Sequence, residues 1–106
     1  VNIFTSRSNM IEGSSRCYGW DSPSGKASGG VYISDDSFGH TGFTGTSLWI
    51  DKENEVIVIL LTNAVHPKRE SKSPTYFDWR QRIHSAAYES LNLKEKNENL
   101  DWRKNW

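Results

Sequence analysis

Residues 38–63 decide the fold, and they read FGHTGFTGTSLWIDKENEVIVILLTN. The six consecutive apolar residues at 56–61 predict a buried strand, and the polar segment 51–54 predicts the turn from a preceding strand around Trp49. Upstream, three glycines stand within seven residues beside threonines and His40, a composition that lets a backbone approach a ligand closely. We therefore predict an antiparallel hairpin over about residues 38–63, with its glycine-rich part as a pocket wall.

The composition indicates one small domain or part of a larger one. The chain has 106 residues, 13 basic and 13 acidic side chains, 35% hydrophobic residues and a mean hydropathy of -0.72. The two signs are interleaved, which argues against a nucleic-acid partner, because such proteins usually carry a basic face. The longest apolar run is too short to cross a membrane, and the first residues lack the layout of a signal peptide. Cys17 is the only cysteine, so we expect no internal disulfide.

The residues before the hairpin carry weaker signals. Residues 1–13 hold too few apolar side chains for an element of their own, so we interpret them as a truncated lead-in. Residues 14–20 fit a short strand, residues 21–30 a surface loop rich in glycine and serine, and residues 31–33 a brief extended segment. Cys17 is expected to be a small buried apolar residue.

One helix and a charged tail are expected after the hairpin. Ser73 and Pro74, or Thr75, suit the start of a helix over about residues 75–91. Apolar residues recur along it at three- and four-residue steps, and we predict that this stripe lies across the sheet: it consists of Tyr76, Trp79, Ile83, Ala87 and Leu91. Asn92 can end the helix, and residues 93–106 form a charged tail with two tryptophans.

These elements make an α+β fold, an antiparallel sheet covered by a C-terminal helix. A strand as apolar as residues 56–61 is typical of a sheet with both faces covered. Only one amphipathic helix is available to cover a face. We therefore expect one face and one edge of the sheet to remain bare, which would make the isolated chain marginally stable or prone to self-association.

Four blocks of the sequence resemble a known family. They are residues 19–25 (GWDSPSG), 38–46 (FGHTGFTGT), 49–51 (WID), and 58–63 (VILLTN) with 65–67 (VHP). In this order and spacing they resemble the C-terminal third of the class C β-lactamase-like serine hydrolases. That superfamily includes penicillin-binding D,D-peptidases and esterases, and a similar module is fused to family 3 glycoside hydrolases. The resemblance covers about residues 1–91.

The resemblance implies that residues 1–106 are a C-terminal fragment of a larger β-lactamase-like α/β fold. Its partners would be the N-terminal remainder of the same hydrolase and a small-molecule or peptide substrate, with no cofactor. The family resemblance also suggests a periplasmic or other extracytoplasmic location.

Roles for the glycine-rich wall follow from the same resemblance. His40, Thr41 and Gly42 match the family's Lys-Thr-Gly strand. His40 and Thr41 would then bind the carboxylate or carbonyl end of the substrate, and Gly42 would leave room for it. The backbone N–H of Phe43 would be the second donor of the oxyanion hole. Histidine in place of the motif's lysine leaves β-lactam, D,D-peptide and ester substrates all open.

The family's nucleophile is missing from this chain. It would be a serine in Ser-x-x-Lys, but the residues three places before the lysines are Pro23, Trp49, Val65, Arg69, Leu91, Leu93 and Asp101. The segment 34–36 (SDD) resembles the family's Ser-Asp-Asn element only superficially, because it lies immediately upstream of His40. We therefore predict no turnover by this chain alone. The alternative is a non-catalytic domain that binds a peptide or carbohydrate on its sheet.

Other conspicuous residues have structural interpretations. His66 and His84 are expected to be solvated, and the histidine spacing does not suit a metal site. Gly39 and Gly45 fit either a pocket wall or a simple bend. The tryptophans at 20, 49 and 79 are expected to supply core or pocket bulk.

Overall fold

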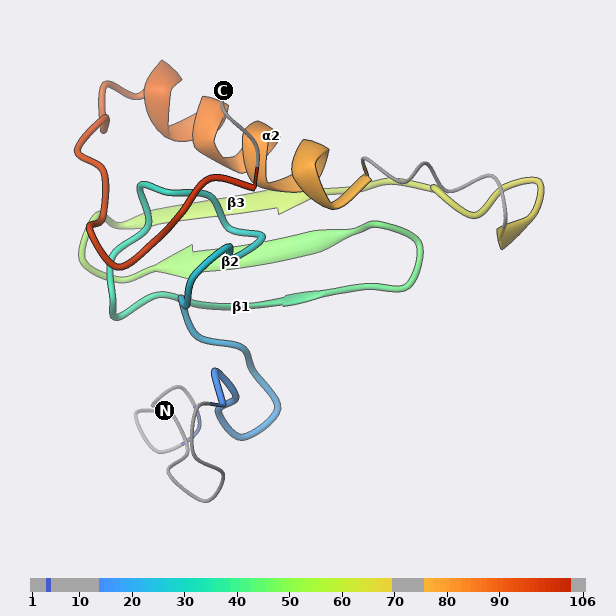
Figure 1. The fold of residues 1–106 in the computed structure, drawn as a ribbon, viewed down its shortest axis with the longest axis horizontal. Coiled ribbons are helices and arrows are strands. Elements are labelled where there is room, and N and C mark those ends of the chain that lie inside the picture. Colours follow the sequence, from blue (N-terminus) through green and yellow to red (C-terminus); the bar gives the residue numbers. More distant parts are fainter. Residues whose placement is uncertain (1–3, 5–13, 70–75, 104–106) are drawn as a thin grey trace.

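Three strands form one antiparallel sheet in a computed structural model that describes residues 4, 14–69 and 76–103. The strands are β1 (Phe38–Thr41), β2 (Ser47–Asp51) and β3 (Val56–Leu60), with β2 in the middle (Figure 1). The register pairs Trp49 of β2 with Gly39 of β1 and Val58 of β3. This confirms the predicted antiparallel sheet, in which the glycine-rich stretch contributes the strand β1.

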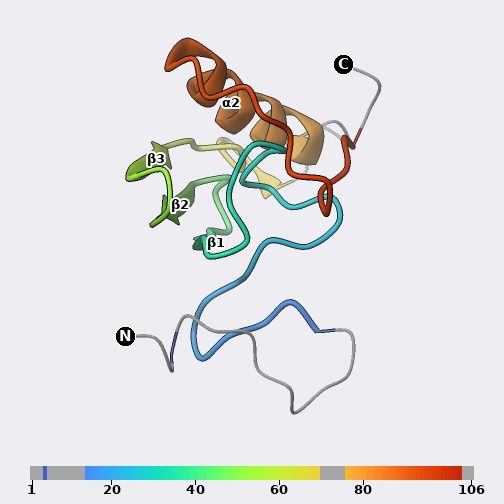
Figure 2. The same ribbon diagram turned by 90° about the vertical axis from the view of Figure 1, so that its left-hand side faces the viewer.

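The helix α2 (Tyr76–Ser90) lies on one face of the sheet and confirms the α+β class (Figures 1 and 2). The helix ends as predicted at Asn92, whose φ of 60° is the left-handed conformation that commonly closes a helix. The N–H of Asn92 donates to the carbonyl of Glu89, and the N–H of Leu93 donates to that of Tyr88, so the last turn is satisfied. The cap predicted at residues 73–75 lies outside the described residues.

The predicted orientation of α2 is wrong. Trp79, Ile83 and Leu91 of the apolar stripe are exposed, Trp79 to 63%, and Ala87 is half-buried. The side chain of Tyr76 lies outside the described residues. The buried side of the helix is instead formed by Arg80, Gln81, His84, Ser85 and Tyr88. Helical periodicity identifies a stripe that needs cover, but it does not say which part of the protein provides that cover.

Hydrogen bonds to distant segments explain why the polar side of α2 can be buried. The hydroxyl of Tyr88 donates to the carboxylate of Asp51 at 2.7 Å, and the hydroxyl of Ser85 accepts from the N–H of Val31 at 3.2 Å. The prediction that His84 is solvated is also wrong, since its ring lies 2.7 Å from the hydroxyl of Ser47. Buried polar groups that are paired in this way avoid the desolvation cost of unpaired ones.

The segment after α2, residues 93–103, folds back over the covered face, and we call it the tail strap (Figure 2). The N–H of Asn97 donates to the carbonyl of Val31, and that of Asp101 donates to the carbonyl of Gly25, both at 2.8 Å. Leu100 is fully buried, and the core cluster that it completes contains Ile33, Trp49 and Tyr88. The expectation of a charged tail therefore missed the apolar contact that anchors this segment.

The second face of the sheet is open over β3, as expected from the shortage of covering elements, whereas Phe38 of β1 on the same face is buried beside the ring of Trp20. Ile57 and Ile59 of β3 are exposed to 63% and 61%. Among the described residues no strand pairs with the outer edge of β3. A strand of this apolar composition therefore has an unpaired edge and an uncovered side.

Residues 14–37 form an irregular segment with isolated bridges, so the short strands expected at 14–20 and 31–33 are wrong. The reason is that Ile33 and Cys17 are buried as individual side chains and not as parts of paired strands. Cys17 is buried as predicted. The segment reaches the outer edge of β1, where Asp21 and Gly39 exchange both backbone hydrogen bonds at 2.7 and 3.0 Å.

Candidate functional site

The predicted pocket wall lies at the end of β1 and in the turn that follows it. His40 is exposed, Thr41 is half-buried and Gly42 is exposed. The N–H of Gly42 donates to the carbonyl of Thr46 at 2.7 Å, and the N–H of Gly45 donates to that of Gly42 at 3.1 Å. Gly45 has a φ of 98°, which suits glycine and explains how the chain turns back so sharply into β2.

Backbone directions alternate along β1. The backbone of Gly39 forms hydrogen bonds with Asp21 on the outer edge of β1. The N–H of Gly42 instead points toward the β2 side, where it donates to the carbonyl of Thr46. Because hydrogen-bonding directions alternate in an antiparallel strand, the backbone groups of Thr41 share the outer edge with Gly39. The outer edge of β1 is thus occupied by Asp21 beside Gly39.

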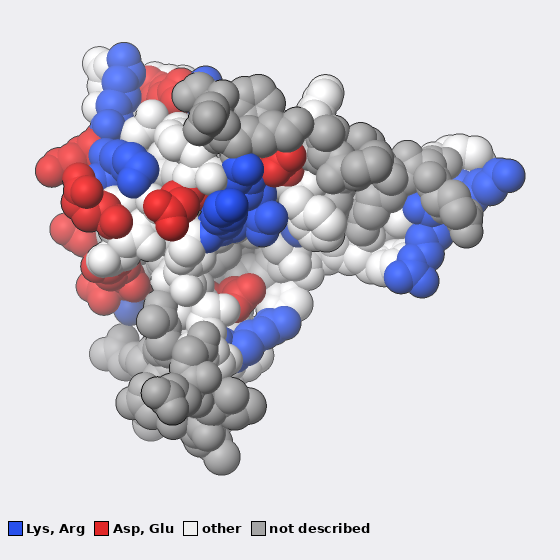
Figure 3. Space-filling view, viewed as in Figure 1, with Lys and Arg blue, Asp and Glu red and all other residues white. Residues whose placement is uncertain are grey.

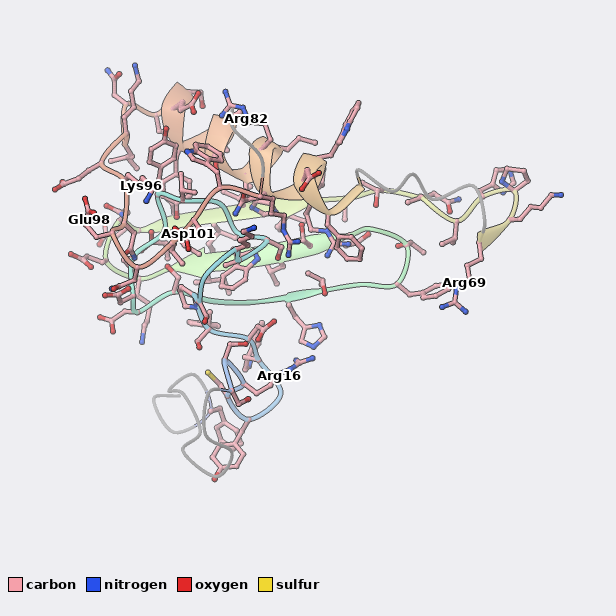
Figure 4. The ribbon with its side chains drawn as sticks, viewed as in Figure 1. Arg16, Arg69, Arg82, Lys96, Glu98 and Asp101 are labelled. Atoms are coloured by element: carbon pink, nitrogen blue, oxygen red, sulfur yellow. The ribbon has the colours of Figure 1, made fainter. Side chains whose placement is uncertain are left out.

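His40 lies on the exposed side of β1 and is oriented by two contacts. Its Nδ1 lies 2.7 Å from the carbonyl oxygen of Thr41, and its Nε2 lies 3.0 Å from a guanidinium nitrogen of Arg16. The carbonyl can only accept and the guanidinium can only donate, so the pair of contacts fits the tautomer protonated at Nδ1. Arg16, which lies beyond β1 in Figure 4, is a neighbour that the sequence gave no reason to expect.

The side chain of Phe43 is exposed to 61%, at the tip of the turn after β1. The guanidinium of Arg69 lies 5.4 Å from the centre of its ring. This distance is within the range of a cation–π contact. The contact joins the turn after β1 to the segment after β3, so the end of the wall is bordered by two parts of the chain.

A pocket of about 250 Å³ lies beside the wall, on the side of the sheet that α2 covers. Thr41 and Trp49 form its floor from the sheet, and Arg80 of α2 and Arg103 of the tail strap also line it. Burial and then the charge of Arg103 lower the pKa of Arg80 to about 10. Figure 3 shows Lys and Arg side chains gathered in the middle of the face seen in Figure 1. The wall therefore borders a concave site with a cationic side.

Of the predicted wall residues, Thr41 lines this pocket, and sequence reasoning missed the two arginines that line it as well. Arg80 points into the covered side only because α2 is turned with its polar side inward. Arg103 reaches the pocket only because Leu100 anchors the tail strap. Neither orientation is a property of a local pattern, so no signal in the sequence pointed to these residues.

A comparison with known protein families identifies the family to which this chain belongs. The family model described as Beta-lactamase matches residues 5–82, which is most of the chain and includes β1, β2, β3 and the first half of α2. The chain belongs to the beta-lactamase family. No curated protein and no solved structure matched it significantly. Membership supports a β-lactamase-like hydrolase character, and the tail strap lies beyond the matched residues.

In this beta-lactamase family chain a serine also lies next to a histidine. The hydroxyl oxygen of Ser47 is 2.7 Å from the Nε2 of His84. Both residues are buried, His84 completely. The Nδ1 of His84 has no hydrogen-bond partner among the described residues, so no third group orients the ring. A nucleophile must be reachable by its substrate. The Ser47 and His84 pair is therefore a structural contact between β2 and α2.

Acid should weaken the fold through His84. Burial and then the charge of Arg80 lower the pKa of His84 to about 4, against about 6.5 in an unfolded chain. Above pH 6.5 both states are neutral at this site, and as the pH falls from 6.5 to 4 the unfolded state alone gains a proton. We expect the free energy of unfolding to fall by about 3 kcal/mol over that window. Urea unfolding at a series of pH values measures it.

His84→Gln keeps a hydrogen-bonding group near Ser47 but cannot titrate, so it should remove this part of the pH dependence. His66→Gln is the matched control, because His66 is exposed. Equal pH dependence in wild type and His84→Gln would contradict the assignment.

The described residues show no group of three or more His, Cys, Asp or Glu side chains that could hold a metal ion. In the same part of the chain, no helix has the length and apolar character needed to cross a membrane.

Proposed function

We propose that this beta-lactamase family chain is the C-terminal part of a class C-like serine hydrolase that transfers acyl groups from β-lactam, D,D-peptide or ester substrates. The observation that carries the proposal is the position of the His40, Thr41 and Gly42 wall. His40 and Gly42 are exposed at the end of β1, and Thr41 between them lines a concave pocket. A substrate lying at the outer edge of β1 beyond Gly39, beside Thr41, would meet the wall and the pocket together.

Within this proposal, His40 and Thr41 bind the carboxylate or carbonyl end of the substrate. Gly42 keeps the wall free of a side chain, and its own position is open, since an added Cβ would meet Thr46 at 3.4 Å and no closer atom. The N–H of Phe43 is the oxyanion donor. Removal of one such donor in other enzymes costs about 2.7 to 4 kcal/mol of transition-state stabilisation.

The nucleophile comes from another part of the hydrolase, which we propose is an N-terminal remainder that carries Ser-x-x-Lys. Two apolar surfaces suit such a partner. One is the bare side of β3 with Ile57 and Ile59, and the other is the outward side of α2 with Trp79 and Ile83. Surfaces of this kind mark interaction sites. The chain alone has no turnover in this proposal.

A substitution at Gly42 tests the wall. The chain is mixed or co-expressed with the upstream segment carrying Ser-x-x-Lys, and the complex is labelled with a fluorescent penicillin or a serine-directed phosphonate. We expect Gly42→Trp to abolish labelling, because the indole would fill the space beside the wall. Labelling at the unmodified rate would remove the wall from the substrate path.

Two controls make that outcome interpretable. Gly42→Ala should retain labelling within about a factor of ten, since its Cβ would contact only Thr46, at 3.4 and 3.6 Å. Co-purification of Gly42→Trp with the upstream segment shows that assembly is intact, so that a loss of labelling reports the wall and not the interface. Binding of a peptide or carbohydrate that is indifferent to Gly42→Trp, with no labelling of any complex, would favour the non-catalytic domain instead.

A further inference from the structure

The backbone of Arg16 is fixed at the outer edge of β1. Arg16 forms an antiparallel bridge with Asp21, and Asp21 exchanges both backbone hydrogen bonds with Gly39 of β1. The turn between Arg16 and Asp21 is closed by the N–H of Cys17, which donates to the carbonyl of Trp20 at 2.8 Å. Arg16 is therefore placed beside β1 by hydrogen bonds that do not involve its own side chain.

The guanidinium of Arg16 lies between a carboxylate and an imidazole. Its Nε is 4.0 Å from a carboxylate oxygen of Asp21, and one of its terminal nitrogens is 3.0 Å from the Nε2 of His40. The same oxygen of Asp21 accepts a hydrogen bond from the hydroxyl of Ser15 at 2.8 Å, which holds the carboxylate in place. Figure 4 shows Arg16 on the side of β1 that faces away from β2. The guanidinium thus reaches His40 from a supported position.

The contact with Arg16 occupies one of the two ring nitrogens of His40. The other nitrogen, Nδ1, lies 2.7 Å from the carbonyl oxygen of Thr41, the next residue of the wall. Because a guanidinium can only donate, the Nε2 of His40 can accept its hydrogen bond only while Nε2 carries no proton. The ring is then neutral, with its one proton on Nδ1, on the side of Thr41. The tautomer of a histidine is set in this way by the hydrogen bonds of its ring nitrogens.

We propose that Arg16 is a positioning residue, which holds His40 as the Nδ1–H tautomer in one orientation at the wall. This inference rests on the proposed hydrolase function and adds to it a residue from the segment before β1. A substrate group beside His40 then meets a ring of fixed orientation, whose one N–H is shared with the carbonyl of Thr41. Without Arg16, the exposed ring is free to rotate and to carry its proton on either nitrogen. Misplacement of such a group by about 1 Å can slow a reaction severely.

NMR of the imidazole nitrogens tests the proposal without any nucleophile. The 106-residue protein is labelled with ¹⁵N, and two-bond ¹H–¹⁵N correlations show which ring nitrogen carries the proton. The spectra are recorded at about pH 8.5, where imidazoles are neutral. We expect the Nδ1–H pattern for His40 in the wild type and a large fraction of the Nε2–H pattern in Arg16→Met. The exposed His66 is the internal reference, and its pattern should be the same in both proteins.

Two further variants separate the hydrogen bond from the loss of a charge. Arg16→Lys keeps a cationic donor and should restore most of the Nδ1–H pattern. Lys94→Met removes an exposed cation of the tail strap and should leave the pattern of His40 unchanged. Unchanged amide signals of Asp21 and Gly39 verify that the segment stays on β1, since their hydrogen bonds involve only backbone atoms. A wild-type His40 with its proton on Nε2, or the same pattern in wild type and Arg16→Met, would overturn the proposal.

The effect on the reaction is measured in the complex with the upstream segment that carries Ser-x-x-Lys. Arg16→Met should slow labelling by the serine-directed phosphonate about tenfold, and Arg16→Lys should recover most of the rate. A tautomer that changes while the labelling rate does not would discard the positioning role and retain the hydrolase. Absence of labelling in every complex, including the wild type, together with the expected tautomers, would discard the hydrolase and retain the control of His40 by Arg16.

Discussion

Asp51→Ala is expected to remove most of the stability of the fold. The carboxylate is 1% exposed at the end of β2, and it accepts five hydrogen bonds. They come from the N–H and hydroxyl of Ser34, the N–H and side-chain amide of Asn54, and the hydroxyl of Tyr88. Although burial alone would raise its pKa, these donors outweigh burial and lower the pKa of Asp51. The group is therefore charged and fully engaged at neutral pH.

Removing the carboxylate leaves several donors unsatisfied at once. Buried donors without partners cost about 1–3 kcal/mol each, so a total of about 4 kcal/mol is expected. The free energy of unfolding of a whole domain is only about 5–15 kcal/mol, and a sheet with one bare face belongs at the low end. Urea unfolding followed by tryptophan fluorescence measures the change.

Asp36→Ala is the matched control for Asp51, because Asp36 is an exposed aspartate in the turn before β1. It should alter stability by less than about 0.5 kcal/mol. Asp51→Asn, which retains an acceptor, should fall between the two. A stable, cooperatively folding Asp51→Ala variant would show that the donors find other partners.

Gly39→Ala is the second change with a large expected effect. A Cβ at this position would overlap the carbonyl oxygen of Leu48 and the indole of Trp49, whose Cγ would lie at 2.7 Å. Trp49 is in the core cluster, and the carbonyl belongs to the neighbouring strand, so neither can move easily. We expect a loss of about 3 kcal/mol, the upper part of the range for overpacking, with weakening of the contact between Gly39 and Asp21.

The comparison with Gly42 gives this prediction its control within the same motif. Gly42→Ala should cost less than about 1 kcal/mol, because its Cβ would meet only Thr46 near van der Waals distance. Thermal unfolding of the two variants side by side measures the difference. Equal destabilisation would contradict the interpretation that Gly39 serves packing while Gly42 serves the pocket wall.

The sheet could be predicted from the sequence because its determinants are local. The apolar run at residues 56–61, the polar turn before it and the glycine-rich turn after β1 each act within a few residues. The end of α2 at Asn92 was predictable for the same reason. The family resemblance added the His40 to Phe43 wall, which occupies an accessible position in the structure.

The rest depends on pairs that are far apart in the chain. The hydrogen bonds of Tyr88 with Asp51 and of His84 with Ser47 each join residues 37 positions apart, and they turn α2 with its polar side toward the sheet. Burial of Leu100 likewise depends on the core cluster, which forms only when α2 and the segment before β1 have packed against the sheet. No periodicity within α2 or the tail strap encodes these partners, so orientation and the second arginine of the pocket could not be predicted.

The inverted orientation of α2 has a consequence for the order of assembly. Hydrogen bonds within this chain join the polar side of the helix to the sheet, whereas the apolar side of the helix is exposed to solvent. In the proposed hydrolase, this chain would acquire its shape first and bind the N-terminal remainder afterwards, as the halves of a split reporter do. Fusing it and its complement to two interacting proteins would then convert their encounter into a readable chemical signal.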